Sequence, residues 1–267
     1  MSFIHTEVIR KGKIGCICGH PGTGKSITTY YTVASYSCEY KIIWIACGTQ
    51  DAKTEDVAVV IMHKGFKQSY HIQYRQLVHD IASMETSRAK TIFVLDDGGL
   101  MVSGLADLIG TTRQVVSKDG LKRQIFVSSS GLETTLTKLP DVVRNRFAVM
   151  MVNGWTLEDY NSAIRNTIFA SSVSKHFQSE TGQDFSSKIG SKFFFAGHCA
   201  RYLFAQDTGA VKRDIEALVA RVPNYDDLGK QLVGISPYVA VHPLFAQVST
   251  GVSDESKVEF VARFALC

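Results

Sequence analysis

The chain has 267 residues, of which 45% are hydrophobic and 20% are charged, and its 29 lysines and arginines exceed its 25 aspartates and glutamates by 4. This composition is typical of a folded globular protein and excludes a long disordered chain. The apolar runs are far shorter than the about 20 residues that a membrane-spanning helix requires, so we expect no membrane partner. The small positive excess does not by itself indicate nucleic-acid binding.

Short hydrophobic runs alternate with amphipathic stretches through the first half of the chain. Strands that are buried on both faces form nearly continuous apolar runs of this kind, and their alternation with helices is typical of a parallel sheet. We therefore predict five strands, at Lys13 to Gly19, Lys41 to Gly48, Thr91 to Gly99, Lys122 to Ser130 and Phe147 to Val152.

The strand pattern ends near Trp155. Beyond it, segments 157–167 and 210–221 carry apolar residues at helical spacing, which predicts amphipathic helices. Residues 1–155 are therefore predicted to form an α/β core, and residues 156–221 a helical lid. Residues 222–267 contain turn residues and three of the five prolines, so we expect a connector or a partly structured extension there.

A motif of eight residues follows the first predicted strand: Gly19, His20, Pro21, Gly22, Thr23, Gly24, Lys25 and Ser26. It fits G-x-x-x-x-G-K-[ST], the Walker A loop that binds nucleotide phosphates. Glycines let the backbone amides wrap around the β-phosphate, and the helix that follows directs its N-terminus toward the same anion. Lys25 is expected to lie between the β- and γ-phosphates, and the Ser26 hydroxyl is expected to bind Mg²⁺.

Two acids, Asp96 and Asp97, end the hydrophobic strand that begins at Thr91. This is the pattern of a Walker B strand. We expect Asp96 to hold Mg²⁺ through water and Asp97 to orient or deprotonate the attacking water. Aspartate is one methylene shorter than the glutamate that is usual at the second position, so hydrolysis is expected to be slow.

Two further groups are candidates for contact with the γ-phosphate. Ser129 or Ser130, at the end of the fourth predicted strand, is expected to sense that phosphate. Arg144 or Arg146, just before the fifth strand, is a candidate arginine finger. Such an arginine stabilises charge on the transferred phosphoryl group, either in cis or from a neighbouring subunit of a homo-oligomer.

Together these motifs predict an α/β P-loop NTPase with a three-layer core and a mostly parallel five-stranded sheet. The expected type is ASCE (AAA+-like), in which an additional strand lies between the P-loop and Walker B strands, with a C-terminal helical lid. The expected cofactors are ATP and Mg²⁺. ATP is preferred to GTP because the chain contains no Asn-Lys-x-Asp motif for guanine.

Residues 111–146 form a basic segment with seven lysines and arginines against three acids. A face of this kind could bind the phosphate backbone of DNA, or a protein partner. The seven are Arg113, Lys118, Lys122, Arg123, Lys138, Arg144 and Arg146.

Residues Phe194 to Tyr202 read Phe-Phe-x-Gly-x-x-Ala-Arg-Tyr. With the Walker motifs, the Arg-Asn-Arg-Phe segment and Trp155-x-x-Glu158, this pattern resembles the P-loop NTPase module of Crinkler-type effectors and related RHS proteins, over roughly residues 10 to 265. The resemblance implies that Arg201 reaches the nucleotide phosphates from the lid. Arg213 is the rival, because Gly209 to Arg213 resembles the sensor-2 segment of AAA+ ATPases.

The resemblance also implies a modular secreted effector that acts inside a host cell, in the nucleus, although the chain itself shows no signal peptide. The sequence thus predicts a Mg²⁺-dependent ATPase. Two alternatives stay open: a nucleotide-gated interaction module that hydrolyses ATP negligibly, and a domain that binds DNA through the basic segment independently of nucleotide.

Overall fold

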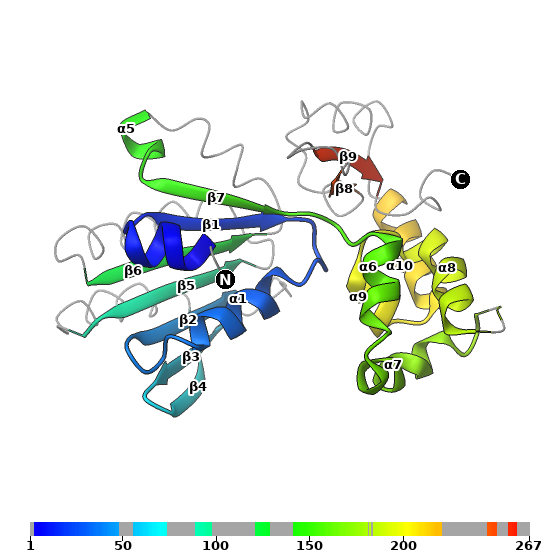
Figure 1. Ribbon diagram of the computed structural model, residues 1–267, viewed down its shortest axis with the longest axis horizontal. Helices are drawn as coiled ribbons and strands as arrows, with labels where there is room; N and C mark the ends of the chain where they lie inside the picture. The colour runs from blue at the N-terminus through cyan, green and yellow to red at the C-terminus, as the bar shows by residue number, and fades with distance from the viewer. Residues whose placement is uncertain are drawn as a thin grey trace. The chain divides into compact units, whose positions relative to one another are not determined.

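A computed structural model describes residues 3–47, 56–73, 89–97, 121–128, 141–180, 182, 184–220, 245–249 and 256–260 (Figure 1). The chain divides into two compact units. The core unit comprises Met1–Cys18 and Lys25–Met151, and the lid unit comprises Gly19–Gly24 and Val152–Cys267. The loop of the Walker A motif is therefore assigned to the same unit as the lid helices. Among the described residues, no helix combines the length and apolar character needed to cross a membrane.

The core unit is built on a seven-stranded sheet with the order β4-β3-β2-β5-β6-β1-β7. The pairs β1–β6, β5–β6 and β2–β5 are parallel, which confirms the mostly parallel sheet that the sequence predicts. The strands are β1 Ile14–Gly19, β2 Lys41–Cys47, β3 Asp56–His63, β4 Phe66–Gln73, β5 Thr91–Asp97, β6 Lys122–Ser128 and β7 Phe147–Val152.

The predicted number of five strands is wrong, because β3 and β4 add an antiparallel hairpin at the edge beyond β2. The hairpin turns through Lys64 and Gly65, whose φ angles of 49° and 84° are both positive. Two successive residues of positive φ make the turn that best matches the twist of the flanking strands. The exposed side chains of β4 lack an apolar run, so the strand had no strong signal in the sequence.

β6 lies between β1 and β5 in the sheet. Cys18 of β1 is level with Ser128 of β6, and Ser128 is level with Asp97 of β5. The carboxyl ends of the P-loop strand and of the Walker B strand are thus at the same edge, with one strand between them. This is the ASCE arrangement that the sequence predicts, and it places the two motifs where ligands bind in α/β sheets.

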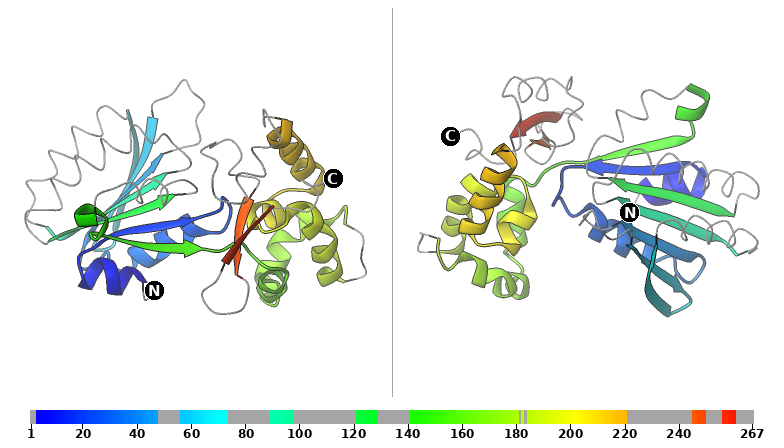
Figure 2. Two further views of the ribbon diagram at one scale, coloured as in Figure 1. Left: turned by 90° about the horizontal axis from the view of Figure 1, so that it is seen from above. Right: turned by 180° about the vertical axis from the view of Figure 1, so that it is seen from behind.

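Strand β1 lies inside the sheet of the core unit, between β6 and β7. All six residues of β1 are buried, so both faces of this strand are covered. Cys16 and Cys18 lie in one core cluster together with Phe93 and Phe126, so both thiols are on the same face of the sheet. Helices α1, Lys25–Ala34, and η1, Ile4–Arg10, lie on one face of the sheet (Figures 1 and 2).

The lid unit contains the helices that the sequence predicts after Trp155. They are α6 Leu157–Ala163, α7 Thr167–Val173, η2 Ser174–Phe177, α8 Phe185–Ala196, α9 Ala200–Ala205 and α10 Thr208–Ala220. A capping box between Thr156 and Asp159 begins α6, and the Asp184 side chain accepts the Ser187 amide at the start of α8. Such caps satisfy backbone donors that have no partner within the helix.

The core of the lid is aromatic. Tyr160, Phe177 and Phe204 are buried together with Ile189 and Leu203. Tyr160 donates a hydrogen bond of 3.0 Å to the Gly197 carbonyl, so its one polar atom is satisfied in the core.

Two short strands that the sequence did not predict follow the lid helices. β8, Phe245–Ser249, and β9, Ser256–Phe260, pair in an antiparallel two-stranded sheet. The other residues of the predicted extension lie outside the described residues.

Candidate nucleotide-binding site

The Walker A loop has a backbone that only glycine tolerates at two positions. Gly19 has φ +153°, and a Cβ atom there would collide with the Val152 carbonyl oxygen. Gly22 has φ +80°, and a Cβ atom there would collide with the Cys199 Sγ. Both positions combine a conformation that L-residues avoid with close approach of another chain segment. The two glycines therefore fix the path of the loop as well as its shape.

Thr23 fixes the second half of the loop from both sides. Its hydroxyl donates a hydrogen bond of 3.0 Å to the carbonyl of His20, which is also buried. Its carbonyl accepts a hydrogen bond of 3.1 Å from the indole Nε1 of Trp155. A loop that binds an anion with its backbone amides must keep its carbonyl oxygens away from that anion. The hydrogen bond from Trp155 keeps the Thr23 carbonyl directed toward the lid.

Arg201 is the lid arginine beside the loop. Its Cβ and its backbone nitrogen lie 3.3 Å and 3.5 Å from the position that a Cβ atom on Gly22 would take. The Arg201 side chain is exposed, and an arginine side chain is long enough to reach an anion in the loop from there. The rival, Arg213, lies in α10, and its Nη1 is 3.5 Å from the position that a Cβ atom on Gly209 would take.

Asp207 lies close to this arginine. The Ala210 amide and the charge of Arg213 lower the pKa of Asp207.

The core unit carries the other half of the motif. Lys25 and Ser26 begin α1 directly after the loop, and Lys25 is 7% exposed. The Ser26 hydroxyl donates a hydrogen bond of 2.9 Å to Oδ1 of Asp96 at the end of β5. Burial raises the pKa of Asp96, whereas the hydrogen bond from Ser26 and the charge of Lys25 oppose this rise.

Ser26 and Asp96 fit a Mg²⁺ site in their chemistry. A hydroxyl and a carboxylate are the oxygen donors that Mg²⁺ prefers, and the ion normally takes one or two protein ligands and completes its shell with water and phosphate oxygens. The two oxygens lie 2.9 Å apart, so one Mg²⁺ ion could be held by the hydroxyl directly and by the carboxylate through water. The sequence motifs therefore meet in space, although they lie 70 residues apart.

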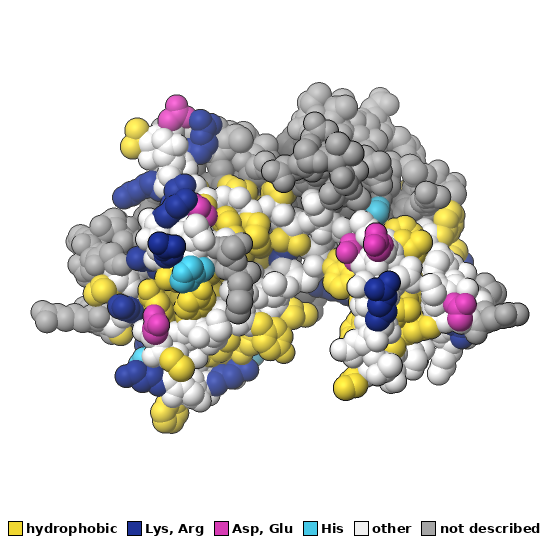
Figure 3. All heavy atoms as spheres, viewed as in Figure 1, with side chains coloured by type: hydrophobic (Ala, Val, Ile, Leu, Met, Phe, Trp, Pro, Cys, Tyr) yellow, Lys and Arg dark blue, Asp and Glu magenta, His cyan; other side chains and the backbone are white. Residues whose placement is uncertain are grey.

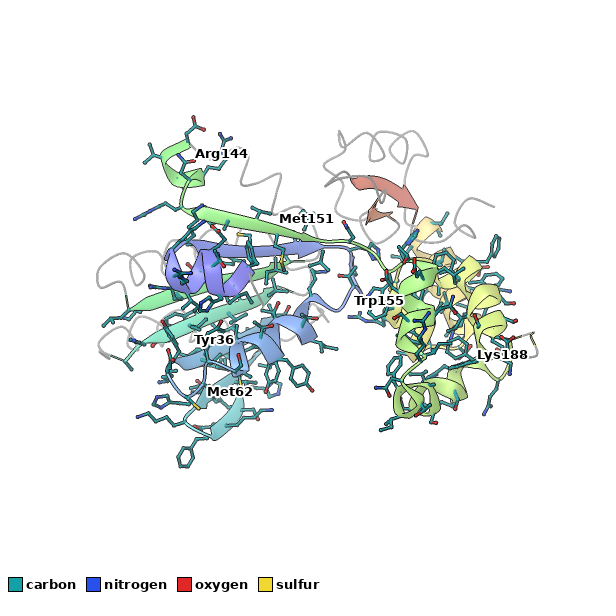
Figure 4. The ribbon with its side chains drawn as sticks, viewed as in Figure 1. Tyr36, Met62, Arg144, Met151, Trp155 and Lys188 are labelled. Carbon is teal, nitrogen blue, oxygen red and sulfur yellow. The ribbon has the colours of Figure 1, made fainter. Side chains whose placement is uncertain are left out.

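The candidate arginine fingers lie at the other end of the sheet. The Ile14 amide bonds to the Arg146 carbonyl at 2.8 Å, so β1 and β7 begin side by side. β1 is six residues long, which separates Arg146 from the carboxyl edge by about 20 Å. Arg144, in the short helix α5, Asp141–Arg144, pairs with Asp141 (Figure 4). This placement corrects the expectation of a finger in cis and leaves only the role in trans as a hypothesis.

Other predicted residues cannot be placed. Ser129 and Ser130 lie outside the described residues, and of Asp97 the structure describes only the backbone, as the last residue of β5.

The basic segment is also corrected in part. Lys122 is 4% exposed, and Arg123 donates through its Nε to the Ile9 carbonyl at 3.2 Å. Neither is a freely exposed cation. On the face of the core unit in Figure 3, acidic and basic side chains lie next to each other near α5. Arg113, Lys118 and Lys138 lie outside the described residues.

Two neighbours of the loop were not predicted as site residues. Trp155 bonds to the loop through its indole, and Cys199 packs on Gly22. Trp155 follows the loop by 132 residues, and only its place in the family-like pattern singled it out. No spacing rule in the sequence predicts either contact.

No family model and no curated protein matches the chain. The solved structures that are similar to it include the following two. Cdc6p from Pyrobaculum aerophilum has 10% identity and a TM-score of 0.39, over 96% of this chain and 86% of that one. The Orc1 protein of Aeropyrum pernix, solved in complex with DNA, has 12% identity and a TM-score of 0.37, over 95% and 85%. Both TM-scores are below 0.5, so the fold assignment rests on the strand order and on the Walker motifs.

Proposed function

We propose that the chain is a Mg²⁺-dependent P-loop NTPase domain that binds and hydrolyses ATP. The observation that carries the proposal is the contact between Ser26 and Asp96, with the hydroxyl 2.9 Å from the carboxylate. Ser26 follows the Walker lysine at the start of α1, whereas Asp96 lies near the end of β5, on the far side of the added strand β6. Neither residue is close to the other in the sequence. Nucleotide binding with a metal ion gives a reason for their meeting.

Each residue has a distinct role in the proposed reaction. The amides of the loop and the Lys25 ammonium bind the β- and γ-phosphates, and Asp97 orients the attacking water. Arg201 extends from the lid to neutralise charge that develops on the transferred phosphoryl group. Mg²⁺, when held by Ser26 and Asp96, neutralises further phosphate charge.

The test is Mg²⁺-dependent phosphate release by the purified chain, with ATP binding measured in parallel. Lys25→Ala should abolish tight ATP binding, because the lysine charge lies between two phosphates. Asp97→Asn should keep ATP binding and lose phosphate release, because it removes only the base. Unchanged affinity in Lys25→Ala would refute the proposal, and an unchanged rate in Asp97→Asn would remove Asp97 from the mechanism.

The same experiment tests a second proposed function, that of a nucleotide-gated interaction module with negligible hydrolysis. Two observations favour it, the short second acid Asp97 and the direct contacts of the lid residues Trp155 and Cys199 with the phosphate loop. Such a module must bind its partner differently in the ATP, ADP and nucleotide-free states. ATP binding without phosphate release would favour it over the ATPase.

The resemblance to Crinkler-type effectors adds a proposal about context. It suggests that the domain acts after secretion in a host cell, in the nucleus, with a host protein or DNA as partner. This rests on the sequence pattern from Phe194 to Tyr202 together with the Walker motifs. A tagged chain expressed in host cells and found outside the nucleus would count against it.

A further inference from the structure

Trp155 is held in place by the lid around it. Its backbone amide donates to the His198 carbonyl at 3.1 Å, and its own carbonyl lies 2.8 Å from the Nδ1 of His198. Because a carbonyl can only accept, Nδ1 is the protonated ring nitrogen in this pair. The indole is stacked on Tyr160, at 5.3 Å and 23°, and meets Phe204 edge to face at 6.1 Å. The lid fold therefore sets the direction of the indole N–H, which donates to the Thr23 carbonyl. Trp155 is labelled in Figure 4.

The hydrogen bond from Trp155 to the Thr23 carbonyl also sets the orientation of the next amide. In a planar trans peptide the carbonyl and the N–H point in opposite directions. With the Thr23 carbonyl on Trp155, the Gly24 N–H points to the side away from the indole. A peptide turned the other way would present a carbonyl oxygen, and not an amide, to a phosphate on that side.

The Thr23–Gly24 peptide is one that could turn easily. Gly24 has φ +90°, and a Cβ atom there would meet nothing within 4 Å. Glycine occupies positive and negative φ with similar ease, so the residue type at position 24 does not by itself select one orientation. The hydrogen bond from Trp155 to the Thr23 carbonyl can make that selection.

We propose that Trp155 is a positioning residue of the phosphate site, which holds the Thr23–Gly24 peptide in the orientation that binds phosphate. The inference rests on the proposed nucleotide binding and adds the means by which the lid prepares the loop. Because coupling is reciprocal, phosphate binding must in turn strengthen the indole hydrogen bond.

The test compares the affinities of Mg²⁺-ATP and of Mg²⁺-pyrophosphate for three proteins. Trp155→Phe keeps an aromatic ring on Tyr160 and removes the N–H. One neutral hydrogen bond corresponds to a 3- to 10-fold weaker affinity, roughly, and the same factor is expected for both ligands because the effect is on the phosphate site. Tyr160→Phe is the matched control, since it removes the hydrogen bond to Gly197 within the same aromatic cluster. It should lower lid stability and leave both affinities unchanged.

A second measurement does not depend on a substitution at Trp155. In Trp44→Phe the indole N–H of Trp155 is the only one in the chain, and its hydrogen exchange should slow several-fold when Mg²⁺-pyrophosphate binds. Unslowed exchange, or equal affinities for the wild type and Trp155→Phe, would overturn the inference while leaving ATP binding intact. A wild type that binds neither ligand would instead overturn the proposed function, and the inference with it.

Discussion

The Ser26 hydroxyl donates a 2.9 Å hydrogen bond to Asp96 Oδ1 and so joins the first turn of α1 to the end of β5. In the proposed function both groups also hold Mg²⁺, so substitutions at Ser26 should separate the effect of the metal from that of the nucleotide. Ser26→Ala should weaken ATP binding at least 10-fold in Mg²⁺ and change it little in EDTA. Titration of ATP by calorimetry under the two conditions measures this difference.

Ser26→Thr is the control for that prediction, because threonine keeps the hydroxyl and is the other residue that the Walker A pattern accepts. It should retain Mg²⁺-dependent binding. If Ser26→Ala lost the same affinity with and without Mg²⁺, the hydroxyl would have a structural role in holding Asp96 and no role at the metal.

Motifs with fixed spacing were predictable, and contacts set by the lid fold were not. Each Walker motif lies at the carboxyl end of a strand that the sequence pattern predicts. In a parallel sheet these ends are at the same edge, so the two motifs are expected to meet there. The placement of Arg146 could also have been predicted, since a residue that precedes a parallel strand lies at the opposite edge from one that follows it. Trp155 reaches Thr23 only through the packing of the lid, which the sequence alone does not determine.

The hydrophobic pattern also explains which strands could be predicted from the sequence and which could not. β2 and β5 are buried runs and were predicted within one or two residues. β4 is an edge strand whose residues are mostly exposed, so it pairs with β3 through backbone hydrogen bonds and the turn at Lys64. Its sequence does not distinguish it from a loop.

Gly22→Ala should abolish nucleotide binding, because the added methyl group collides with Cys199 Sγ at a φ of +80°. The collision and the backbone strain are separable. Cys199→Ala in the same chain removes the sulfur and should restore part of the affinity, and the remaining loss reports the strain of about 1–2 kcal/mol for an L-residue at positive φ. ATP titration of the single and double variants measures both parts.

Gly190→Ala is the matched glycine control. Gly190 lies within α8, and a Cβ atom there would meet nothing within 4 Å. Alanine should stabilise the lid by about 0.5–1 kcal/mol without changing ATP affinity.

If Cys199→Ala did not restore any ATP affinity to Gly22→Ala, the thiol would not be the group that excludes a side chain at Gly22.

Arg201→Ala should reduce the rate of ATP hydrolysis more than the affinity for ATP. The Cβ atom of Arg201 lies beside Gly22 of the loop, and in the proposed reaction its guanidinium meets charge that develops during phosphoryl transfer. Arginines in this role contribute factors of about 1,000 or more. Steady-state kcat and the ATP Kd, measured on the same preparation, distinguish the two effects. Arg165→Ala, an exposed arginine of the lid, should change neither. Equal losses in kcat and affinity would assign Arg201 to ground-state binding.

Lys192 should make the stability of the lid depend on pH. Its side chain is 0% exposed, and its Nζ donates to the carbonyls of His176 and Gln206 and lies 4.4 Å from the centre of the Phe177 ring. Burial lowers the pKa of Lys192 from 10.5 to about 8, although the negative charges of Glu180 and Asp207 oppose the shift.

The folded protein therefore releases this proton at a lower pH than the unfolded chain, and the free energy of unfolding should rise as the pH rises above about 8. Between pH 8 and pH 10 the gain from this group is about 2 kcal/mol. Tyr202 acts in the opposite direction only above pH 10, since burial raises its pKa from 10.0 to about 12. Urea unfolding of Trp44→Phe, followed by Trp155 fluorescence at each pH, measures the lid. Adding Lys192→Met removes the titrating group and should remove the gain, and an equal gain in both proteins would show that other groups cause it.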